Sequence, residues 1–279
     1  MDKTIVFDLY RFHLLPITTN QVSLFEEKLS YEELVEKKNT FFDIIVQDFQ
    51  NKPQDLPVEL YSYEDKTYLF RLANPKTTTI YRNFAEIPEN TEPYIYIIIN
   101  TDPNVQKIAI SRNPDASSTS SASKNVLLKI FLKYLKEYSL SIEFEQMFES
   151  KTFWSYAKKY EGRIKSVNFE IIKPNLSKIS YTIKDTLKPL MEITNSHKTH
   201  LKLDASKEGV LDNINKDNTF VEGLVNYSSE GGGNISMKIA GMSSQIKTNN
   251  MTKTKKINEL LIKGSPDQVI KVWKDITSE

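Results

Sequence analysis

The chain has 279 residues, of which 39% are hydrophobic and 26% are charged, and its formal net charge is +1. It contains no cysteine, which excludes disulfides, thiolate metal ligands and cysteine nucleophiles. No apolar stretch approaches the roughly 20 residues that a membrane-spanning helix needs, and the first residues lack the apolar core of a signal peptide. These features are typical of a globular protein in a reducing cytoplasm.

The N-terminal part of the chain predicts an antiparallel sheet with one helix. A strand-forming segment, rich in aromatic and β-branched residues, opens the chain. Residues 30–49 carry apolar side chains at helical spacing, and Ser30 with Glu33 forms a capping box at the start of this helix. Short alternating segments then flank turns at 64–66 and 101–104, which indicates two β-hairpins.

A serine-rich segment, residues 112–124, interrupts this pattern and indicates a mobile loop or a domain junction. The helix expected over 125–138 carries leucine and phenylalanine on one side and lysine on the other. Some basic amphipathic helices lie on a membrane or a phosphate backbone, and in others the lysines simply face water. A strand over 140–147 and a short helix over 150–160 are expected to follow.

The last part of the chain predicts helices packed on one face of a mixed sheet. Its expected strands are 162–172, 199–205, 234–241 and 253–262. Its expected helices are 176–193, with a kink at Pro189, 218–230, and 265–276, which begins with a Ser265 cap followed by Pro266.

The predicted fold class is therefore α+β. We expect three parts: an antiparallel α+β domain over 1–112, a serine-rich loop and helical connector over 113–160, and a lysine-rich α+β domain over 161–279. Residues 1–110 carry 11 Lys and Arg against 17 Asp and Glu, whereas residues 111–279 carry 26 against 19. An acidic part joined to a basic part suggests different partners for each, although ordinary solvated surface produces the same pattern.

Three consecutive glycines, Gly231 to Gly233, stand between an expected helix and an expected strand. A phosphate-binding P-loop has the opposite order, strand before helix, and ends in Gly-Lys followed by Ser or Thr, which this chain lacks. Glycines that follow a helix adopt left-handed backbone and allow the helix to end. The glycine run is therefore predicted to be a turn.

Few residues fit a metal site or a hydrolase site. His197 and His200 are three positions apart, but a zinc site needs three or four ligands, and neither cysteine nor a nearby carboxylate pair completes the set. His13 lies in or near a predicted strand, where a structural role is expected, and the chain has no G-x-S-x-G motif. We therefore assign no catalytic residue, metal or cofactor.

A Mg²⁺-dependent nuclease of the restriction type is an alternative. Such enzymes hold the metal with an acidic residue and a following (D/E)-x-K on a strand, where lysine steadies the attacking water. The candidate fragments are Pro114-Asp115, Glu149-Ser150-Lys151 and Glu64-Asp65-Lys66. They are predicted to lie in a loop, at the head of a helix and in a hairpin turn, so none has the required strand context.

Basic residues give the stronger indication of function. Residues 151–202 carry 11 Lys and Arg against four acidic residues, and residues 238–263 carry six Lys against one Glu. Lysine and arginine neutralise phosphates and release counterions, which gives sequence-independent affinity for nucleic acids. Trp154, Tyr156 and Tyr160 interleave with these cations, and such a combination suits single strands, although the same rings fit a core. The predicted phosphate-contacting residues are Lys158, Lys159, Arg163, Lys165, Lys253, Lys255 and Lys256.

A series of short β patterns over residues 57–175 resembles a known family. EDKTYLFRL (64–72) is similar to a D-G-K-T-F-L-F hairpin strand. PYIYIIINTDPNVQKIAISRN (93–113) resembles a following pair of apolar strands around an Asp turn, ending at an arginine, here Arg112. The serine-rich loop, the helix, the strand at 140–147 and GRIKSVNFEII follow in the same order. This order resembles the RexA phage-exclusion proteins of temperate phage and the Kiwa-type KwaB antiviral proteins of bacteria.

The resemblance implies a dimeric, non-enzymatic protein that binds DNA without strong sequence preference and senses phage replication or recombination intermediates. It also implies signalling to a membrane or effector protein encoded by an adjacent gene. Our sequence-based hypothesis is a cytoplasmic DNA-binding component of antiphage defence, with the lysine-rich part contacting phosphates electrostatically. The alternatives are the nuclease and a protein-interaction subunit without nucleic-acid contact, for which an exposed apolar stripe on the helix at 125–137 would be the sign.

Overall fold

In the computed structural model, residues 4–17, 29–173 and 187–278 are described, and the chain folds into two compact units. Of the described residues, the first unit comprises 4–8, 14–17, 29–143 and 254–278, and the second comprises 9–13, 144–173 and 187–253. This division differs from the expected boundaries after residues 112 and 160, because segments far apart in the sequence pair with each other. The first unit thus includes the end of the chain.

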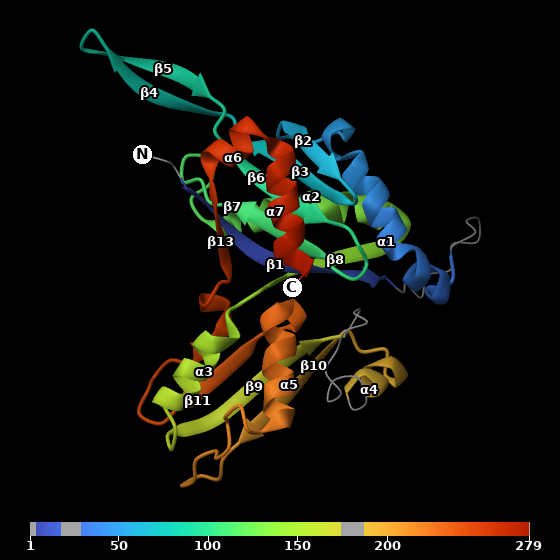
Figure 1. The fold of residues 1–279 in the computed structure, drawn as a ribbon, viewed down its shortest axis with the longest axis vertical. Coiled ribbons are helices and arrows are strands. Elements are labelled where there is room, and N and C mark those ends of the chain that lie inside the picture. The colour runs from blue at the N-terminus through green and yellow to red at the C-terminus, as the bar shows by residue number, and fades with distance from the viewer. Residues whose placement is uncertain (1–3, 18–28, 174–186, 279) are drawn as a thin grey trace. The chain divides into compact units, whose positions relative to one another are not determined.

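The first unit is built on a seven-stranded sheet, in the order β13-β1-β7-β6-β3-β2 with β8 also paired to β1 (Figure 1). Its strands are β1 (Thr4–Pro16), β2 (Val58–Glu64), β3 (Thr67–Ala73), β6 (Tyr94–Asn100), β7 (Lys107–Ser111), β8 (Leu140–Gln146) and β13 (Thr254–Asn258). Both expected hairpins, β2–β3 and β6–β7, are present and antiparallel. The central strands β3, β6 and β7 are buried on both faces, which explains their nearly continuous apolar sequence.

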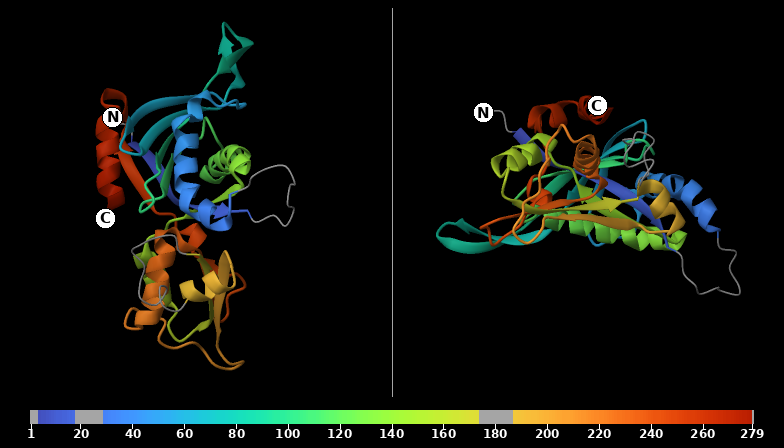
Figure 2. Two further views of the ribbon diagram at one scale, coloured as in Figure 1. Left: turned by 90° about the vertical axis from the view of Figure 1, so that its right-hand side faces the viewer. Right: turned by 90° about the horizontal axis from the view of Figure 1, so that it is seen from below.

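Helices cover both faces of this sheet, with α1 and α2 on one side and α7 on the other (Figure 2). The helical elements of the first unit are α1 (Tyr31–Gln47), η1 (Phe49–Asn51), α2 (Ser120–Leu135), η2 (Lys136–Tyr138), α6 (Glu259–Gly264) and α7 (Pro266–Ser278). The expected capping box at Ser30 and Glu33 is confirmed. The one α-helix expected in residues 1–112 is α1, and α2, α6 and α7 join the same unit from later in the sequence.

Two local predictions in this unit need correction. The serine-rich segment is not entirely a loop, because Thr119 accepts a hydrogen bond from the Ala122 backbone and Ser120 begins α2. The strand expected over 253–262 ends at Asn258, whose side chain accepts a hydrogen bond from Leu260 N and so caps α6. In both places a side-chain cap begins a helix earlier than the apolar pattern indicates.

The apolar stripe of α2 is buried within the first unit. Leu127, Phe131 and Leu135 have no exposed surface. The ring of Phe131 meets that of Phe42 at 5.3 Å between centroids and that of Phe49 at 5.0 Å. The stripe is therefore core, and the exposed stripe expected of a protein-interaction subunit is not found there.

A two-stranded arm extends from the first unit (Figure 1). It consists of β4 (Lys76–Arg82) and β5 (Ala85–Thr91), which pair only with each other among the described strands. At its tip Asn83 and Phe84 both have positive φ, +50° and +63°, and Phe84 is fully exposed. The arm thus presents a large apolar side chain to solvent in a backbone conformation that favours glycine.

The second unit contains a four-stranded sheet in the order β10-β9-β11-β12. Its strands are β9 (Ile164–Ile172), β10 (Lys198–Asp204), β11 (Ile235–Ile239) and β12 (Ile246–Lys247). Its helical elements are α3 (Ser150–Lys159), α4 (Lys188–Ile193), α5 (Thr219–Tyr227), η4 (Ser228–Gly232) and η5 (Thr248–Asn250). All three strand pairings are antiparallel, so the α+β class is confirmed but the mixed sheet was wrong. Most of the helix expected over 176–193 lies outside the described residues, and α4 carries Pro189 in its first turn.

The glycine run is a turn, as predicted. It follows α5 and leads into β11, and Gly231 has φ +82° while Gly233 has φ +137°. A Cβ atom on Gly233 would lie 1.8 Å from the carbonyl oxygen of Glu170, so the turn needs glycine for space as well as for backbone conformation. The Gly231 carbonyl accepts a hydrogen bond from Nε2 of buried His13, at 2.7 Å, which gives that histidine a structural role.

Candidate functional site

The four-stranded sheet of the second unit has one apolar face and one polar face. Helices α3 and α5 pack on the apolar face (Figure 1), where Val167, Phe169 and Met237 belong to the buried core. Alternate side chains along each strand point the other way, and residues directly opposite each other on paired strands share a face. We call the second side the polar face. Its side chains are Ser166, Asn168, Glu170, Lys198, His200, Lys202, Asp204, Ser236, Lys238 and Lys247.

The strand register aligns a row of polar residues across this face. Lys202 of β10 is opposite Asn168 of β9, Asn168 is also opposite Ser236 of β11, and Ser236 is opposite Lys247 of β12. Neighbouring strands are about 4.8 Å apart, so the backbone positions of the two lysines are separated by roughly 14 Å. In the next row Lys238 is opposite Ser166. Three ammonium groups therefore surround neutral hydroxyl and amide groups.

Ion pairs leave this part of the face positive. Lys198 pairs with Glu170 at 2.9 Å and with Glu145 at 3.8 Å, which neutralises one end of β10. The Lys202–Asp204 pair is 2.8 Å long, but both side chains are more than half exposed, so water competes with it. Neither Lys238 nor Lys247 forms an ion pair within the described chain. These two lysines are available to an external anion.

A polar hollow of about 240 Å³ lies beside Lys247 on the same face. Its lining residues are Asn168, Glu170, Asn234, Ile235, Ser236, Gln245, Lys247 and Asn249. The Asn234 amide donates to Glu145 at 2.9 Å and is therefore held in place. Amides and hydroxyls both donate and accept hydrogen bonds, so this hollow suits a sugar, a base edge or a phosphate oxygen.

Three of the residues predicted from the sequence gather at the end of α3. Lys158, Lys159 and Arg163 are exposed there. The ammonium of Lys159 lies 5.4 Å from the ring centroid of Tyr160, and the Arg163 guanidinium lies 5.8 Å from it. Because α3 packs on the apolar face, this group lies on the opposite side of the sheet from the polar face. It forms a second cationic surface of the unit.

The other four predicted residues do not join this group. Lys165 donates to the backbone carbonyls of Lys207 and Gly209, at 3.3 and 2.5 Å, and so holds the turn after β10. Lys253 pairs with Glu230 at 3.0 Å. Lys255 and Lys256 lie on β13 in the first unit. Arg163 also donates to the Ala240 carbonyl at 2.8 Å. The seven residues are thus divided between two units, and three of them make internal contacts.

The predicted aromatic residues are largely structural. Trp154 is 8% exposed and packs at 5.0 Å between ring centroids on Phe153, which fits the core alternative. Tyr156 and Tyr160 are half-buried and stack with centroids 6.5 Å apart. The aromatic rings left for a strand of bases at the end of α3 are the half-buried Tyr156 and Tyr160.

The lysines of the polar face were missed by sequence reasoning. In KTHLKLD (198–204) the leucines alternate with lysine and histidine. In ISMKI (235–239) Lys238 alternates with apolar residues in the same way. This alternation is the signal that assigns Lys202 and Lys238 to a solvent face. It does not indicate which strands are neighbours, so the row that ends at Lys247 follows only from the register.

The fragments considered for a nuclease are not assembled into a site. Lys274 pairs with Glu64 at 3.5 Å and with Asp65 at 2.9 Å, which occupies both carboxylates. Glu149 immediately precedes α3 in the second unit, whereas Asp115 lies in a loop of the first. Within the described ranges, no three His, Cys, Asp or Glu side chains are grouped as metal ligands would be. Of these fragments only Glu64 lies on a strand, at the end of β2, and its carboxylate is paired with Lys274.

No family model matches the chain, and no curated protein matches it. In the part of the chain that the structure describes, every helix is too short or too polar to cross a membrane.

Proposed function

We propose that this protein binds DNA without strong sequence preference, through the polar face of its second unit. The observation that carries the proposal is the row from Lys202 through Asn168 and Ser236 to Lys247. Its lysines are separated by roughly 14 Å, comparable with the major-groove width of about 12 Å. Phosphates on the two sides of a groove are matched by such a spacing.

The chemistry of the face favours backbone contacts over base reading. Lysine is a mobile point charge that neutralises phosphate without the fixed geometry of a bidentate contact. The amides of the neighbouring hollow add hydrogen bonds to sugars or to whichever base edge is present. Residues 144–253 carry 16 Lys and Arg against 12 Asp and Glu, so the unit as a whole attracts polyanions. Affinity of this kind falls steeply with salt.

A role in antiphage defence is proposed from the resemblance to the RexA and KwaB families. In that role the protein is a non-enzymatic cytoplasmic sensor, acts as a homodimer and signals to a membrane or effector protein encoded by an adjacent gene. The β4–β5 arm supports an assembly role, because Tyr81, Phe84 and Ile87 are all exposed on it. A protein-interaction subunit without nucleic-acid contact is the second candidate, favoured by the same arm.

The test compares three proteins by fluorescence anisotropy with a labelled 20-nucleotide single strand and the matching duplex, over a series of salt concentrations. They are the wild type, the polar-face triple variant Lys202→Ala/Lys238→Ala/Lys247→Ala, and the α3 triple variant Lys158→Ala/Lys159→Ala/Arg163→Ala. The two variants remove the same charge from opposite sides of one sheet. Each lost phosphate contact lowers the magnitude of the salt slope by about 0.7 to 0.9. The polar-face variant should therefore lose a slope of roughly two to three, with affinity falling on all sequences alike.

Each alternative has its own outcome. If only the α3 variant loses affinity, the protein binds DNA but through the second cationic surface, and the polar-face assignment is wrong. If the wild type binds neither strand at low salt, the DNA-binding function is wrong and the interaction subunit remains. A variant that retains native unfolding behaviour is required for either reading, and circular dichroism provides that check.

A further inference from the structure

A small apolar hollow of about 80 Å³ lies in the first unit at the foot of the β4–β5 arm. The foot is formed by residues 73–76 and 91–93, and the tip by residues 82–85. Ala73 and Asn74 of the foot line the hollow together with residues of α2 and of the loop that precedes it. We propose that the hollow receives the Phe84 ring of a second copy of the chain, so that two copies exchange arms. This inference rests on the homodimer of the proposed function and names its interface.

The hollow has the size and the lining that suit one apolar side chain. Its walls include Leu56, Leu72, Ile95 and Val126. Sites for small molecules have volumes of about 300 to 1,000 Å³, so this hollow is too small for a separate ligand. A cavity of about 150 Å³ holds a whole benzene molecule. An open hollow of about 80 Å³ therefore accommodates the outer part of one ring.

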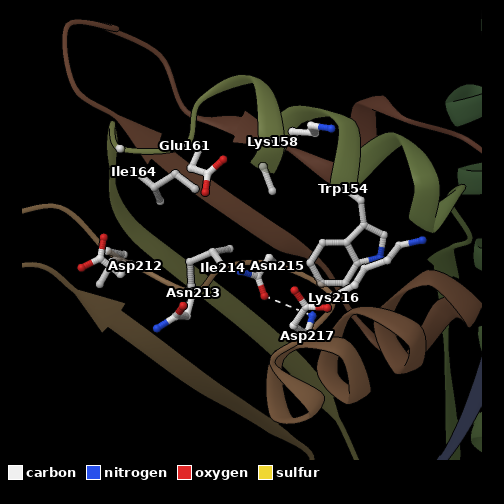
Figure 3. A pocket seen from close by; sticks show the side chains of 13 residues that line it. Trp154, Lys158, Glu161, Ile164, Asp212, Asn213, Ile214, Asn215, Lys216 and Asp217 are labelled. Carbon is white, nitrogen blue, oxygen red and sulfur yellow. Dashed lines mark hydrogen bonds between the residues drawn. The ribbon is translucent and has the colours of Figure 1, made fainter.

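Two other hollows of the described chain, both in the second unit, suit a phenyl ring less well. The cavity of about 400 Å³ between the end of α3 and the loop over 211–217 is bordered by Glu161, Asp212 and Asp217 (Figure 3). A ring buried there would remove water from carboxylates, which costs free energy. The hollow beside Lys247 is lined mainly by amides and a hydroxyl. The hollow of the first unit is therefore the better match for Phe84.

The foot of the arm is fixed to the wall of the hollow. Asn74 N donates to Pro93 O at 2.9 Å, and the Asn74 side chain donates to Ala116 O at 2.6 Å. Lys76 Nζ donates to the neighbouring Asp115 O. Ala116 itself lines the hollow. The arm therefore leaves the sheet at a defined place beside the hollow.

The arm carries Phe84 away from the hollow of its own chain (Figure 1). The register of β4 and β5 is continuous, from Lys76 opposite Thr91 to Arg82 opposite Ala85. Six residue steps of about 3.4 Å separate the two ends of β4, so the tip stands roughly 20 Å from the foot. Because the strand pairing is unbroken, the ring does not return to its own hollow. A ring that fills the hollow comes from another chain.

The tip has reason to be covered. A two-stranded hairpin alone is marginally stable in water, and this one exposes Tyr81 and Ile87 as well as Phe84. Phe84 also keeps a left-handed backbone, with φ +63°, while its side chain contacts nothing that buries it. Burial of the ring in a second copy offsets this strain through the hydrophobic effect.

A second copy meets the requirement with no further element. When two arms lie side by side in opposite directions, the tip of each reaches the foot of the other, so both hollows are filled at once. This arrangement has two-fold symmetry and closes after two copies. Charge supports it, because the tip carries exposed Arg82, whereas the foot is flanked by exposed Glu92 and Asp115.

The mass in solution measures the assembly. Sedimentation of the wild type at about 100 μM should give the mass of two chains, since a contact with a micromolar dissociation constant is nearly complete at that concentration. Phe84→Gly should weaken the dimer by more than about 100-fold, because two anchoring rings are lost and each is worth about 30-fold. The variant should fold, since glycine is favoured at the backbone conformation of position 84.

A matched pair of valine substitutions tests the hollow. Val126→Asp places a carboxylate in the lining, and Val35→Asp places one on α1, outside the lining. The two valines are 37% and 40% exposed, and both lie on helices of the first unit. Val126→Asp should give monomers, whereas Val35→Asp should dimerise as the wild type does.

Engineered cysteines locate the contact, because the chain has no cysteine of its own. Ala85→Cys lies beside Phe84 at the tip, and Ser118→Cys lies beside Ser117 of the hollow, both at exposed positions. Under mild oxidation a mixture of the two single variants should form a disulfide-linked dimer. Neither variant should crosslink by itself, since the two tips lie an arm's length apart, and so do the two hollows.

Each contrary result has a distinct meaning. A wild type that sediments as a monomer overturns the arm exchange together with the homodimer. A dimer that survives Phe84→Gly overturns the arm exchange and leaves the homodimer in place. If Val126→Asp dimerises like Val35→Asp, or if Ala85→Cys crosslinks by itself, the hollow is not where the tip binds and the proposal is wrong. DNA binding is measured separately with the polar-face variants, so its failure is distinguishable from all of these.

Discussion

Arg112 donates three hydrogen bonds to the buried carboxylate of Asp8: from Nη2 to Oδ1 at 2.6 Å, and from Nε to Oδ1 at 3.1 Å and to Oδ2 at 3.0 Å. The Asp8 side chain is 2% exposed, whereas that of Arg112 is half exposed. The Arg112 backbone N–H also donates to Val6 O at 2.8 Å. Side chain and backbone of one residue thus join the end of β7 to β1 inside the first unit.

Replacing Arg112 by alanine should destabilise the first unit strongly. The change leaves a buried carboxylate without its cation, and such a loss costs about 3 kcal/mol of unfolding free energy. Urea unfolding followed by circular dichroism measures the difference. Lys263→Ala, which breaks the Lys263–Glu259 pair at 2.8 Å, is the control and should change stability little, because the Lys263 side chain is 55% exposed. Equal effects of the two substitutions would contradict the importance of burial.

Alanine substitutions at two glycines distinguish the destabilisation caused by a steric clash from that caused by a left-handed backbone conformation. Gly162 has φ +71° and nothing within 4 Å of a Cβ position, so Gly162→Ala should cost about 1 kcal/mol from backbone strain alone. Gly233→Ala adds a collision with the Glu170 carbonyl and should cost more than about 3 kcal/mol. Thermal unfolding of both variants provides the comparison. A Gly233→Ala protein as stable as Gly162→Ala would mean that the turn readily rearranges.

Alkaline pH should weaken the second unit through Tyr227. Burial raises the pKa of this phenol well above its usual range, and the hydroxyl donates to Ile172 O at 2.9 Å. The folded protein therefore favours the neutral phenol. The contribution of this phenol to the free energy of unfolding is complete below the unfolded pKa of about 10, and above that pH it declines by up to about 1.4 kcal/mol per pH unit. In Tyr227→Phe this decline is absent. Urea midpoints of the two proteins should accordingly converge between pH 10 and 11.5, and parallel curves would refute the assignment.

The arm tip offers a substitution that should stabilise the isolated protein. Phe84 has φ +63° and makes no buried contact, because its side chain is fully exposed. Phe84→Gly removes the left-handed strain and should raise the unfolding free energy by about 1 kcal/mol. Calorimetry at low protein concentration measures this change. If stability falls instead, Phe84 packs on something in solution, and light scattering would identify a second copy of the chain as its partner.

Much of the fold follows from local patterns in the sequence. The hairpins with turns at 64–66 and 101–104 were predictable because turn residues stand between alternating β segments. The helix that follows Ser30 was predictable because two residues, Ser30 and Glu33, form its capping box. The glycine run was predictable because its position between helix and strand excludes a P-loop. The pairing of β13 with β1 was not predictable, since residues 254–258 and 4–8 lie at opposite ends of the sequence. For this reason the two compact units differ from the expected division of the chain.

The cationic residues at the end of α3 could be predicted from the sequence, whereas those of the polar face could not. Clusters of lysine along the chain pointed to α3, where Lys158, Lys159 and Arg163 are neighbours in sequence and in space. The polar face draws its cations from three different strands, so no local window contains them. A count of lysines also cannot distinguish Lys165, which holds a turn, from Lys238, which faces solvent. The strand register shows which lysines share the polar face, and the hydrogen bonds of Lys165 show its structural role.

The first unit has consequences for synthesis on the ribosome. Its sheet edge β13 and the helices α6 and α7 come from residues 254–278, after the whole second unit has been translated. Until then β1 has an unpaired flank and the α7 side of the sheet is bare, which is the state most open to aggregation. A released chain that ends at Lys253 should accordingly contain a folded second unit and an incomplete first one, so the unit that begins first in the sequence is the last to be completed.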